Sequence, residues 1–380
     1  MTPTQRNEER PVAALLVPDL LSMLEESPHD VAAETEELHP ADLADVAEAM
    51  PRDRVAALLA ALAPARAADV LEYLEDDLRT DVLEAMTTSQ AAALVTQMTP
   101  DDRADALEEL EASTVDDILA EIPVEARGET ERLLAYPTDS AGGLMTTEFV
   151  SVPEDTPVER ALLGVRAVAR TGRREAMYAI YATDRDGRVR GVLSLRELLA
   201  APEGARIADV AWEEIVSVLP TADREEVAQV TSKYDLVAVP VVDDVGRVLG
   251  VVTVDDVIDA IVEEQTEDAQ KFGGMEALQE PYMQMGLAGM LRKRAGWLCA
   301  LFLGEMLTTA AMGHFEMEIE RAVVLALFIP LIISSGGNSG SQATSLIIRA
   351  MALQEIRLRD WWRVALREVP AGLALGLILG

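Results

Sequence analysis

The sequence predicts a multidomain fold: an all-α superhelical repeat domain, an α/β domain of two tandem units, and an α-helical transmembrane segment. A 12-residue repeat, a duplicated strand-and-helix pattern and long apolar runs near the C-terminus predict these three parts. The charge divides the chain in the same way. Residues 1–270 hold 58 Asp and Glu against 22 Lys and Arg, whereas residues 271–380 hold 9 against 10. Such an acidic body attracts cations and is unsuited to binding nucleic acid.

The first part is an acidic repeat over residues 38–135, after an N-terminal extension of residues 1–37. Apolar residues recur every 12 positions, at Leu38, Met50, Leu62, Leu74, Met86, Met98, Leu110 and Ile122. In most copies a turn-forming residue follows two positions later, as at Pro40 and Pro100, where a helix would begin. Units of fixed period stack into a superhelix. A plain scaffold, or one that docks another protein, remains an alternative.

The second part contains two copies of one unit, residues 137–200 and 201–262. Each copy ends in a β-rich run, an acidic turn with glycine, a second β-rich run and a helix. Both share the pattern G-x-x-[ST]-x-x-[DE], at Gly191–Glu197 and Gly250–Asp256. This pattern, repeated at a spacing of about 60 residues, resembles a tandem pair of cystathionine-β-synthase-type (CBS) motifs. The resemblance implies an α/β tandem CBS domain, with one strand opening the second copy at Val216-Ser217-Val218.

A linker joins the second copy to the apolar C-terminal region. It covers residues 257–283 and is expected to contain one acidic helix over Val257–Lys271. We call this linker helix the plug helix. Residues 290–380 then form a partial transmembrane domain. Its spans are expected at Gly296–Met312 and Ala322–Ile348, which are apolar and long enough to cross a bilayer.

Charge sets the expected orientation of these spans. A basic collar, Arg292-Lys293-Arg294, precedes the first span and arginines follow the second, whereas the connecting loop His314–Glu320 carries only acidic charges. Positive-inside reasoning therefore places the acidic body in the cytoplasm of a multi-pass cell-membrane protein. Ala371–Gly380 looks like the start of a third span, so we expect the chain to be a fragment.

The order of these parts resembles the MgtE family of magnesium channels. Two further motifs carry the resemblance: Ala141-Gly142-Gly143-Leu144-Met145, and the Pro330-x₅-Gly-Gly-Asn-x-Gly-x-Gln segment that ends at Gln342. The resemblance implies a homodimer in the lipid bilayer, whose cytosolic domains sense Mg²⁺ and close the pore. Mg²⁺ would be both the regulatory ion and the transported ion. No nucleophile–base pair or phosphate-binding loop is apparent, so no enzymatic activity is expected.

Correspondence with the family implies a set of metal-binding carboxylates. They are Asp69, Asp101 and Asp105 in the repeat domain, Asp223, Glu225, Asp235, Asp256 and Asp259 in the second CBS copy, and Glu264, Glu267 and Asp268 on the linker helix. Mg²⁺ is small and keeps much of its water, so one or two carboxylates can hold it. Taken singly, each of these residues also fits a solvated surface charge. These oxygen ligands alone do not decide which of Mg²⁺, Mn²⁺, Co²⁺ and Ca²⁺ the site selects.

Two further sites are predicted. Gly336, Gly337, Asn338 and Gln342 are expected to line the pore, where unwound backbone could present oxygens to a hydrated cation. Close helix packing is the alternative role of such glycines. CBS pairs often bind adenine nucleotides, and Arg196 and Glu197 stand at the corresponding positions, so ATP is a further possible ligand. The alternative function is therefore a membrane-anchored nucleotide sensor without transport.

Overall fold

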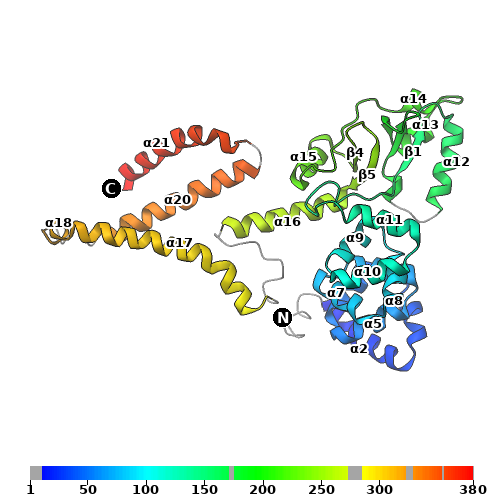
Figure 1. The fold of residues 1–380 in the computed structure, drawn as a ribbon, viewed down its shortest axis with the longest axis horizontal. Helices are drawn as coiled ribbons and strands as arrows, with labels where there is room; N and C mark the ends of the chain where they lie inside the picture. The colour runs from blue at the N-terminus through cyan, green and yellow to red at the C-terminus, as the bar shows by residue number, and fades with distance from the viewer. Residues whose placement is uncertain (1–10, 171–174, 273–284, 322–327, 353–354, 380) are drawn as a thin grey trace. The chain divides into compact units, whose positions relative to one another are not determined.

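The computed structural model describes residues 11–170, 175–272, 285–321, 328–352 and 355–379 (Figure 1). The chain divides into two compact units, Met1–Glu264 and Gln265–Gly380. The first unit contains the helical repeat and the CBS pair. The second contains most of the apolar helices.

The helical repeat has the period that the sequence predicts. After α2 (Pro11–Glu26), η1 (Pro28–Asp30) and α3 (Val31–Glu34), eight helices begin at 12-residue intervals. They are α4 (Pro40–Ala49), α5 (Arg52–Ala61), α6 (Pro64–Glu72), α7 (Asp76–Ala85), α8 (Thr88–Val95), α9 (Pro100–Glu108), α10 (Ala112–Glu121) and α11 (Val124–Leu133). Proline in the first turn of α4, α6 and α9 presets the helical φ angle and removes an N–H that would have no partner.

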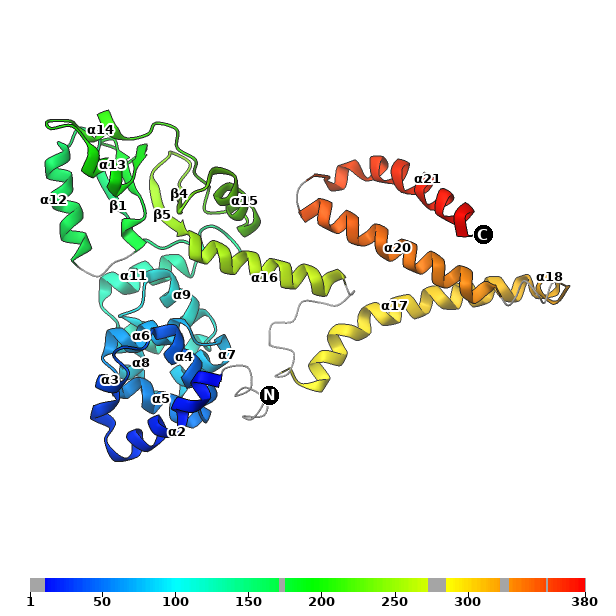
Figure 2. The same cartoon turned by 180° about the vertical axis from the view of Figure 1, so that it is seen from behind.

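Alternate helices pack against one another and form two rows. Contacts join α4, α6, α8 and α10 into one row, and α5, α7, α9 and α11 into the other. Figure 2 shows the stacked helices of the repeat. The recurring apolar residues lie just after the C-terminal end of each helix. Their side chains are buried in the core between the rows, as at Met50, Leu74 and Ile122. Since each helix is only eight to ten residues long, this burial rather than intrinsic propensity holds the helices.

The CBS pair contains two small sheets. In the first copy β1 (Val150–Pro153) pairs in parallel with β2 (Ile180–Thr183), which pairs antiparallel with β3 (Val189–Leu193). In the second copy β4 (Ala238–Val242) and β5 (Val248–Thr253) form an antiparallel pair. The helices are α12 (Val158–Ala169), η2 (Glu175–Met177), α13 (Leu195–Ala200), α14 (Ile207–Val210), α15 (Arg224–Tyr234) and α16 (Val254–Phe272).

The strand expected at Val216-Ser217-Val218 is reduced to a single bridge between Val218 and Val241. The chain after it turns to pair with another segment, because Ala141 and Gly142 donate hydrogen bonds to the carbonyls of Ala222 and Pro220. The prediction of a full strand there is therefore wrong.

The same junction explains the paired glycines of the Ala141–Met145 motif. A Cβ at Gly142 would lie 2.6 Å from the Tyr136 ring, and one at Gly143 would lie 2.4 Å from the carbonyl oxygen of Pro137. Glycine thus lets the chain after the helical repeat pass close to its own backbone. Gly250 on β5 has the same role, since its Cβ would lie 2.5 Å from the carbonyl oxygen of Thr146.

Substitution of Gly143 by alanine should destabilise the first unit by about 1 to 3 kcal/mol, because backbone must move to admit the methyl group. Gly128→Ala is the matched control: Gly128 lies in α11, and apart from its chain neighbours and the backbone of its own helix no atom of the described residues lies within 4 Å of its added Cβ. That control should stabilise the chain by about 0.5 to 1 kcal/mol. Denaturant unfolding of the two variants measures the difference, and equal stabilities would contradict this packing.

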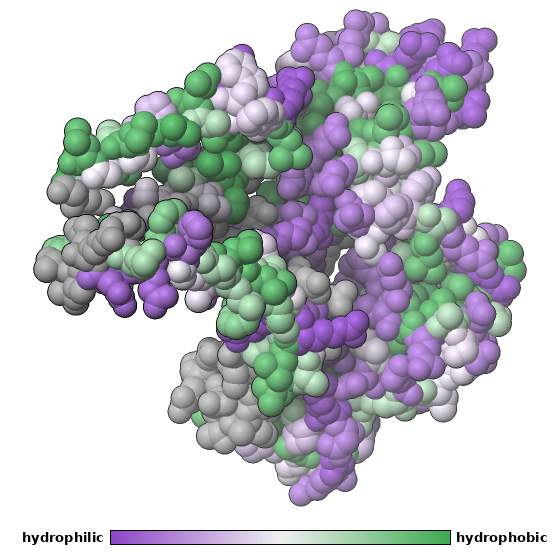
Figure 3. Space-filling model, turned by 60° about the vertical axis from the view of Figure 1, so that its left-hand side comes forward, coloured by the Kyte–Doolittle hydropathy of each residue, from purple (hydrophilic) through white to green (hydrophobic). Residues whose placement is uncertain are grey.

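The second unit consists of helices. They are α17 (Leu287–His314), α18 (Glu316–Arg321), α20 (Ile329–Ala352), η3 (Leu358–Asp360) and α21 (Trp361–Leu379). Among the described helices, α17 is the one long and apolar enough to cross a membrane. Large apolar side chains such as Phe302, Leu303 and Leu331 are exposed on these helices. Figure 3 shows green, hydrophobic surface along this unit. The expected loop His314–Glu320 is largely helical, since α18 begins at Glu316.

A candidate cation-sensing site

Helix α9 brings two of the predicted carboxylates to one face. Asp101 lies in its first turn and Asp105 one turn later, so the two side chains share a face. Asp101 is only 5 % exposed, and its Oδ1 atom has no hydrogen-bond partner among the described residues. An unsatisfied buried carboxylate oxygen is costly unless a cation or a proton reaches it.

The start of α16 supplies the carboxylates that face α9. Strand β5 runs directly into this helix, and the hydroxyl of Thr253 donates a 2.5 Å hydrogen bond to Asp256. Burial, and then the charge of Asp101, raise the pKa of Asp256 well above its usual range. The pKa of Asp259, one turn further on, is raised by burial and by Asp255. Residues about 155 positions apart in the sequence therefore meet as like charges.

Electrostatic repulsion extends along α9. Burial and the charge of Asp102 raise the pKa of Asp101 to about 7. Although part of Asp105 reaches solvent, burial of its carboxylate and the charges of Asp101 and Asp102 raise its pKa to about 7. Arg79 lowers the pKa of Asp105, but by less than burial, Asp101 and Asp102 raise it. Its guanidinium also pairs with Asp76 at 2.8 Å and Glu109 at 3.3 Å.

Sequence reasoning missed two members of this cluster. Burial and the charge of Asp102 raise the pKa of Glu72, at the end of α6, to about 8. Asp102 is not among the acids that the family resemblance singles out, but burial raises its pKa, against a 2.5 Å hydrogen bond from Thr99. No local pattern distinguishes these residues from the many other acids of the repeat. Only the stacking of α6, α9 and the start of α16 brings them together.

Several predicted ligands lie elsewhere. Asp69 is exposed on α6, although its charge reaches Glu72. Asp223 caps the N-terminus of α15 by accepting a hydrogen bond from the amide of Glu225, whereas Asp235 ends that helix with a left-handed φ of 52°. An 11-residue helix is about 16 Å long, so Asp235 cannot share an ion with Asp223 or Glu225 of the same chain.

The acids of the linker helix make ion pairs. Glu264 accepts a 2.5 Å hydrogen bond from Arg224, which also bonds Glu263 at 2.7 Å. Glu267 pairs with Lys271 one turn along α16, with 2.5 Å between Oε1 and Nζ. The side chain of Asp268 lies outside the described residues. Before either glutamate could bind a cation, it would have to leave its present partner.

The donor set around Asp101 fits a hydrated cation. In the described part of the chain, no three acidic, His or Cys side chains approach closely enough to hold a bare ion. Mg²⁺ does not need such a cage, because it keeps several waters and is held by one or two carboxylates. The unpaired Oδ1 of Asp101 and the facing carboxylate of Asp256 provide hard oxygen ligands of that number.

Comparison with known proteins agrees with this architecture. Family models match as MgtE intracellular N domain (residues 38–139), CBS domain (residues 141–204 and 207–263) and divalent cation transporter (residues 329–380). The magnesium transporter MgtE of Thermus thermophilus is 42 % identical over 253 residues, which are 67 % of this chain and 56 % of that protein. The chain belongs to the MgtE family. It spans about half the length of the curated MgtE relatives it matches.

Two solved structures cover the first unit. The soluble part of a magnesium transporter matches with a TM-score of 0.61 and 32 % identity, over 67 % of this MgtE chain and 99 % of that one. The cytosolic domain of the Mg²⁺ channel MgtE in complex with ATP matches with a TM-score of 0.61 and 34 % identity, over 65 % and 99 %. The predicted combination of helical domain, CBS pair and apolar helical region is confirmed as the MgtE architecture.

The predicted nucleotide residues of this MgtE chain have structural partners. Glu197 accepts hydrogen bonds from the amide of Ser194 at 2.7 Å and from the indole of Trp212 at 2.5 Å. Burial raises its pKa, but these hydrogen bonds outweigh burial and lower it overall. Arg196 is exposed. The carboxylate of Glu197 thus caps α13, and a ribose could reach it only by displacing Trp212.

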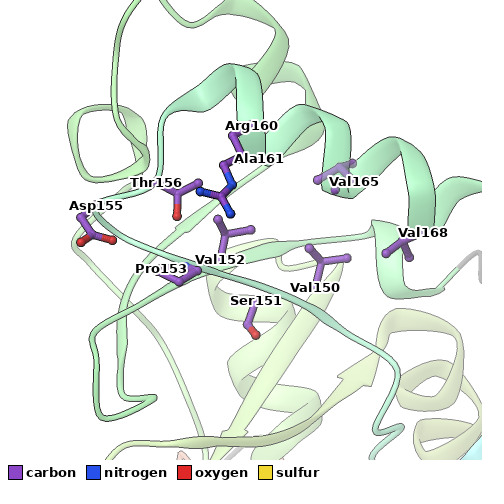
Figure 4. A pocket seen from close by; sticks show the side chains of 11 residues that line it. Val150, Ser151, Val152, Pro153, Asp155, Thr156, Arg160, Ala161, Val165 and Val168 are labelled. Atoms are coloured by element: carbon purple, nitrogen blue, oxygen red, sulfur yellow. The ribbon is translucent and has the colours of Figure 1, made fainter.

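A cavity of about 490 Å³ lies on a different part of the first CBS copy, between β1 and α12 (Figure 4). Val150, Val152 and Val165 form its apolar wall, and Thr156 and Arg160 contribute polar groups. Arg196 and Glu197 do not line it. The cavity therefore has no connection with the predicted nucleotide residues.

The predicted pore segment of this MgtE chain is helical. Gly336, Gly337, Asn338 and Gln342 all lie inside α20, so the expectation of unwound backbone is wrong. A continuous helix satisfies its backbone groups internally, and Pro330 does not interrupt it because it lies in the first turn. Asn338 and Gln342 are one turn apart and exposed, so they form a polar stripe on one face.

Proposed function

We propose that this chain is the sensing half, with the first transmembrane helices, of an MgtE-type magnesium channel that intracellular Mg²⁺ closes. The observation that carries this proposal is the buried carboxylate of Asp101 on α9, which has one unpaired oxygen and faces Asp256 on α16. The magnesium-transporter names of the relatives support the choice of ion. Asp101, Asp105, Asp256 and Asp259 are the residues that would hold the regulatory ion.

The mechanism follows from charge. Without a cation, ionised carboxylates on α9 and α16 repel each other in a partly buried space, where water screens them poorly. A divalent ion between them removes the repulsion and binds the closed arrangement more tightly than the open one. Mg²⁺ is therefore a ligand of the compact state, and its differential affinity sets how far the equilibrium shifts. Weak sites with one or two carboxylates each respond in the millimolar range, as an intracellular sensor requires.

Limited proteolysis of the full chain tests the sensor. Millimolar Mg²⁺ should protect the segment between α11 and β1 from cleavage, and the double variant Asp101→Ala with Asp256→Ala should abolish that protection. Asp116→Ala is the matched control, since Asp116 is an exposed acid on α10 away from the cluster. Cleavage that is the same with and without Mg²⁺ in the wild-type chain would refute the sensor.

We further propose that the polar face of α20 lines the ion path, with Asn338 the residue of largest effect. Cation uptake by a magnesium-starved host that expresses the protein should fall several-fold for Asn338→Ala. Thr344→Ala, on another face of α20, should retain uptake. Undiminished uptake by Asn338→Ala would remove the pore assignment.

ATP is a second ligand that one observation favours, because a relative of 34 % identity is described in complex with ATP. Binding at Arg196 and Glu197 would require the Trp212 indole to leave Glu197. The full chain should then show ATP-dependent quenching of Trp fluorescence that Trp212→Phe removes. Binding of ATP with no response to Mg²⁺ would favour the alternative function, a membrane-anchored nucleotide sensor.

The homodimer and the cytoplasmic orientation of the acidic domains complete the proposal. The basic residues Arg292, Lys293 and Arg294 in the N-terminal part of α17, together with the acidic α18, support this orientation by the positive-inside rule. Sedimentation of the detergent-solubilised chain should give twice the protomer mass. A cysteine introduced in α18 should react with a membrane-impermeant reagent from outside the cell, and labelling only after lysis would contradict this orientation.

A further inference from the structure

A second polar network lies behind the carboxylate cluster and joins the helical repeat to the CBS pair. Arg103 on α9 is only 4 % exposed. Its Nε donates a 2.8 Å hydrogen bond to the hydroxyl of Thr130, and its Nη2 lies 3.5 Å from the carboxylate of Glu129 on α11. The other oxygen of Glu129 accepts a 2.5 Å hydrogen bond from the hydroxyl of Thr147. Glu129 thus bridges the repeat and the segment that leads into β1.

The residue next to Thr147 contacts the sensor itself. Thr146 is completely buried, and its hydroxyl hydrogen-bonds Asp101. Its backbone pairs with Val251 on β5, with N–O distances of 2.8 and 2.9 Å. Strand β5 ends at Thr253, whose hydroxyl holds Asp256. One short segment therefore touches both the carboxylate on α9 and the strand that carries its opposing carboxylate.

We propose that Glu129 and Thr147 are positioning residues of the cation sensor: their hydrogen bond holds the Thr146–Thr147 segment between α9 and β5, and so sets the approach of Asp101 to Asp256. Neither residue touches the ion. Both act through Thr146, and the inference rests on the proposed Mg²⁺ sensing.

The energetics favour this role over that of an ordinary surface contact. A hydrogen bond to a charged acceptor is stronger than a neutral one, and here the acceptor is also paired with a buried guanidinium. Loss of the Thr147 hydroxyl frees the segment on one side while the charge pair of Arg103 and Glu129 remains. The carboxylates on α9 and α16 would then approach each other less closely on average, so a cation would bind both with lower affinity.

The test is a Mg²⁺ titration of the full chain in detergent, followed by hydrogen–deuterium exchange in residues 140–149 and in α9. Thr147→Val, which keeps the shape and removes the hydroxyl, should raise the Mg²⁺ concentration for half-maximal protection about tenfold. Thr80→Val is the matched control. It removes a similar bond, from Thr80 to Glu109 at 3.1 Å, that stays within the helical repeat, and it should leave the midpoint unchanged.

A second variant keeps the test decisive if Thr147→Val folds poorly. Glu129→Ala removes the contacts to both Arg103 and Thr147 and should shift the midpoint at least as far. If the wild type responds to Mg²⁺ and both variants respond with the same midpoint, this inference is overturned but the proposed sensing function is not. A wild-type chain with no response would overturn the proposed sensing function, and this inference with it. A change of thermal stability without a change of midpoint would show a purely structural role and would also overturn it.

Discussion

Replacement of Asp101 by asparagine should stabilise the Mg²⁺-free chain at pH 8 by about 2 kcal/mol. Most substitutions in a well-packed interior destabilise, so the sign of this effect is distinctive. Asp101 is buried with one oxygen unpaired, and its pKa is raised to about 7, so at pH 8 the structure must hold an unfavourable charge. Asparagine keeps the shape and removes the charge. From the pKa shift alone, removal of the charge should stabilise the chain by about 4 kcal/mol. We expect the incompletely hydrogen-bonded amide of asparagine to offset part of this gain.

Denaturant unfolding of the full chain in a chelator measures this effect, with Asp116→Asn as the exposed control that should change little. The same Asp101→Asn variant should gain less stability than the wild type when millimolar Mg²⁺ is added, because one ligand has been lost. A destabilised variant in chelator would show that Asp101 makes a favourable charged contact, and would contradict the account of repulsion.

Acidification should stabilise the Mg²⁺-free chain between pH 8 and pH 5, by about 3 kcal/mol from the buried Asp101 alone, and Asp105 and Glu72 should add to this effect. Asp101 and Asp105 have pKa values raised to about 7, and Glu72 one raised to about 8, all above those of an unfolded chain. In this range the folded chain binds more protons than the unfolded chain, so stability falls as pH rises. The contribution is fully present below about pH 4 and is lost as pH rises through the folded pKa values of about 7 to 8.

Thermal unfolding across this pH range, in chelator and in millimolar Mg²⁺, measures the dependence. Mg²⁺ should flatten the profile, since a bound cation replaces the protons as the neutralising charge. Glu72→Gln should reduce the slope near pH 8, where the other carboxyl groups are largely ionised. Stability that rises with pH from 5 to 8 in chelator would contradict the raised pKa values of this cluster.

The helical repeat could be predicted from the sequence because its signal is local. Each 12-residue unit carries its own proline or cap and its own apolar residue, so counting along the chain locates the helices. The CBS strands were predictable for the same reason, apart from the one at Val216–Val218. That strand is lost because Ala141 and Gly142 bind the backbone that follows it, which is a contact no local pattern reveals.

The site was predictable only through resemblance. Asp101 and Asp256 lie far apart in the sequence, and nothing local shows that α9 and the start of α16 meet. Glu72 and Asp102 were missed because their shifted pKa values come from stacking of the helices rather than from any motif. The linker acids Glu264 and Glu267 have basic partners at short range, which a count of carboxylates does not anticipate.

The central claim is that carboxylates on α9 and α16 share one cation. A double-mutant cycle of Asp101→Asn and Asp256→Asn, followed by the Mg²⁺ midpoint of hydrogen–deuterium exchange protection in α9, tests it directly. If one ion bridges both residues, either single variant should raise the midpoint strongly and the double variant should raise it little further. If the two shifts simply add in the double variant, the residues bind independently and the shared site does not exist.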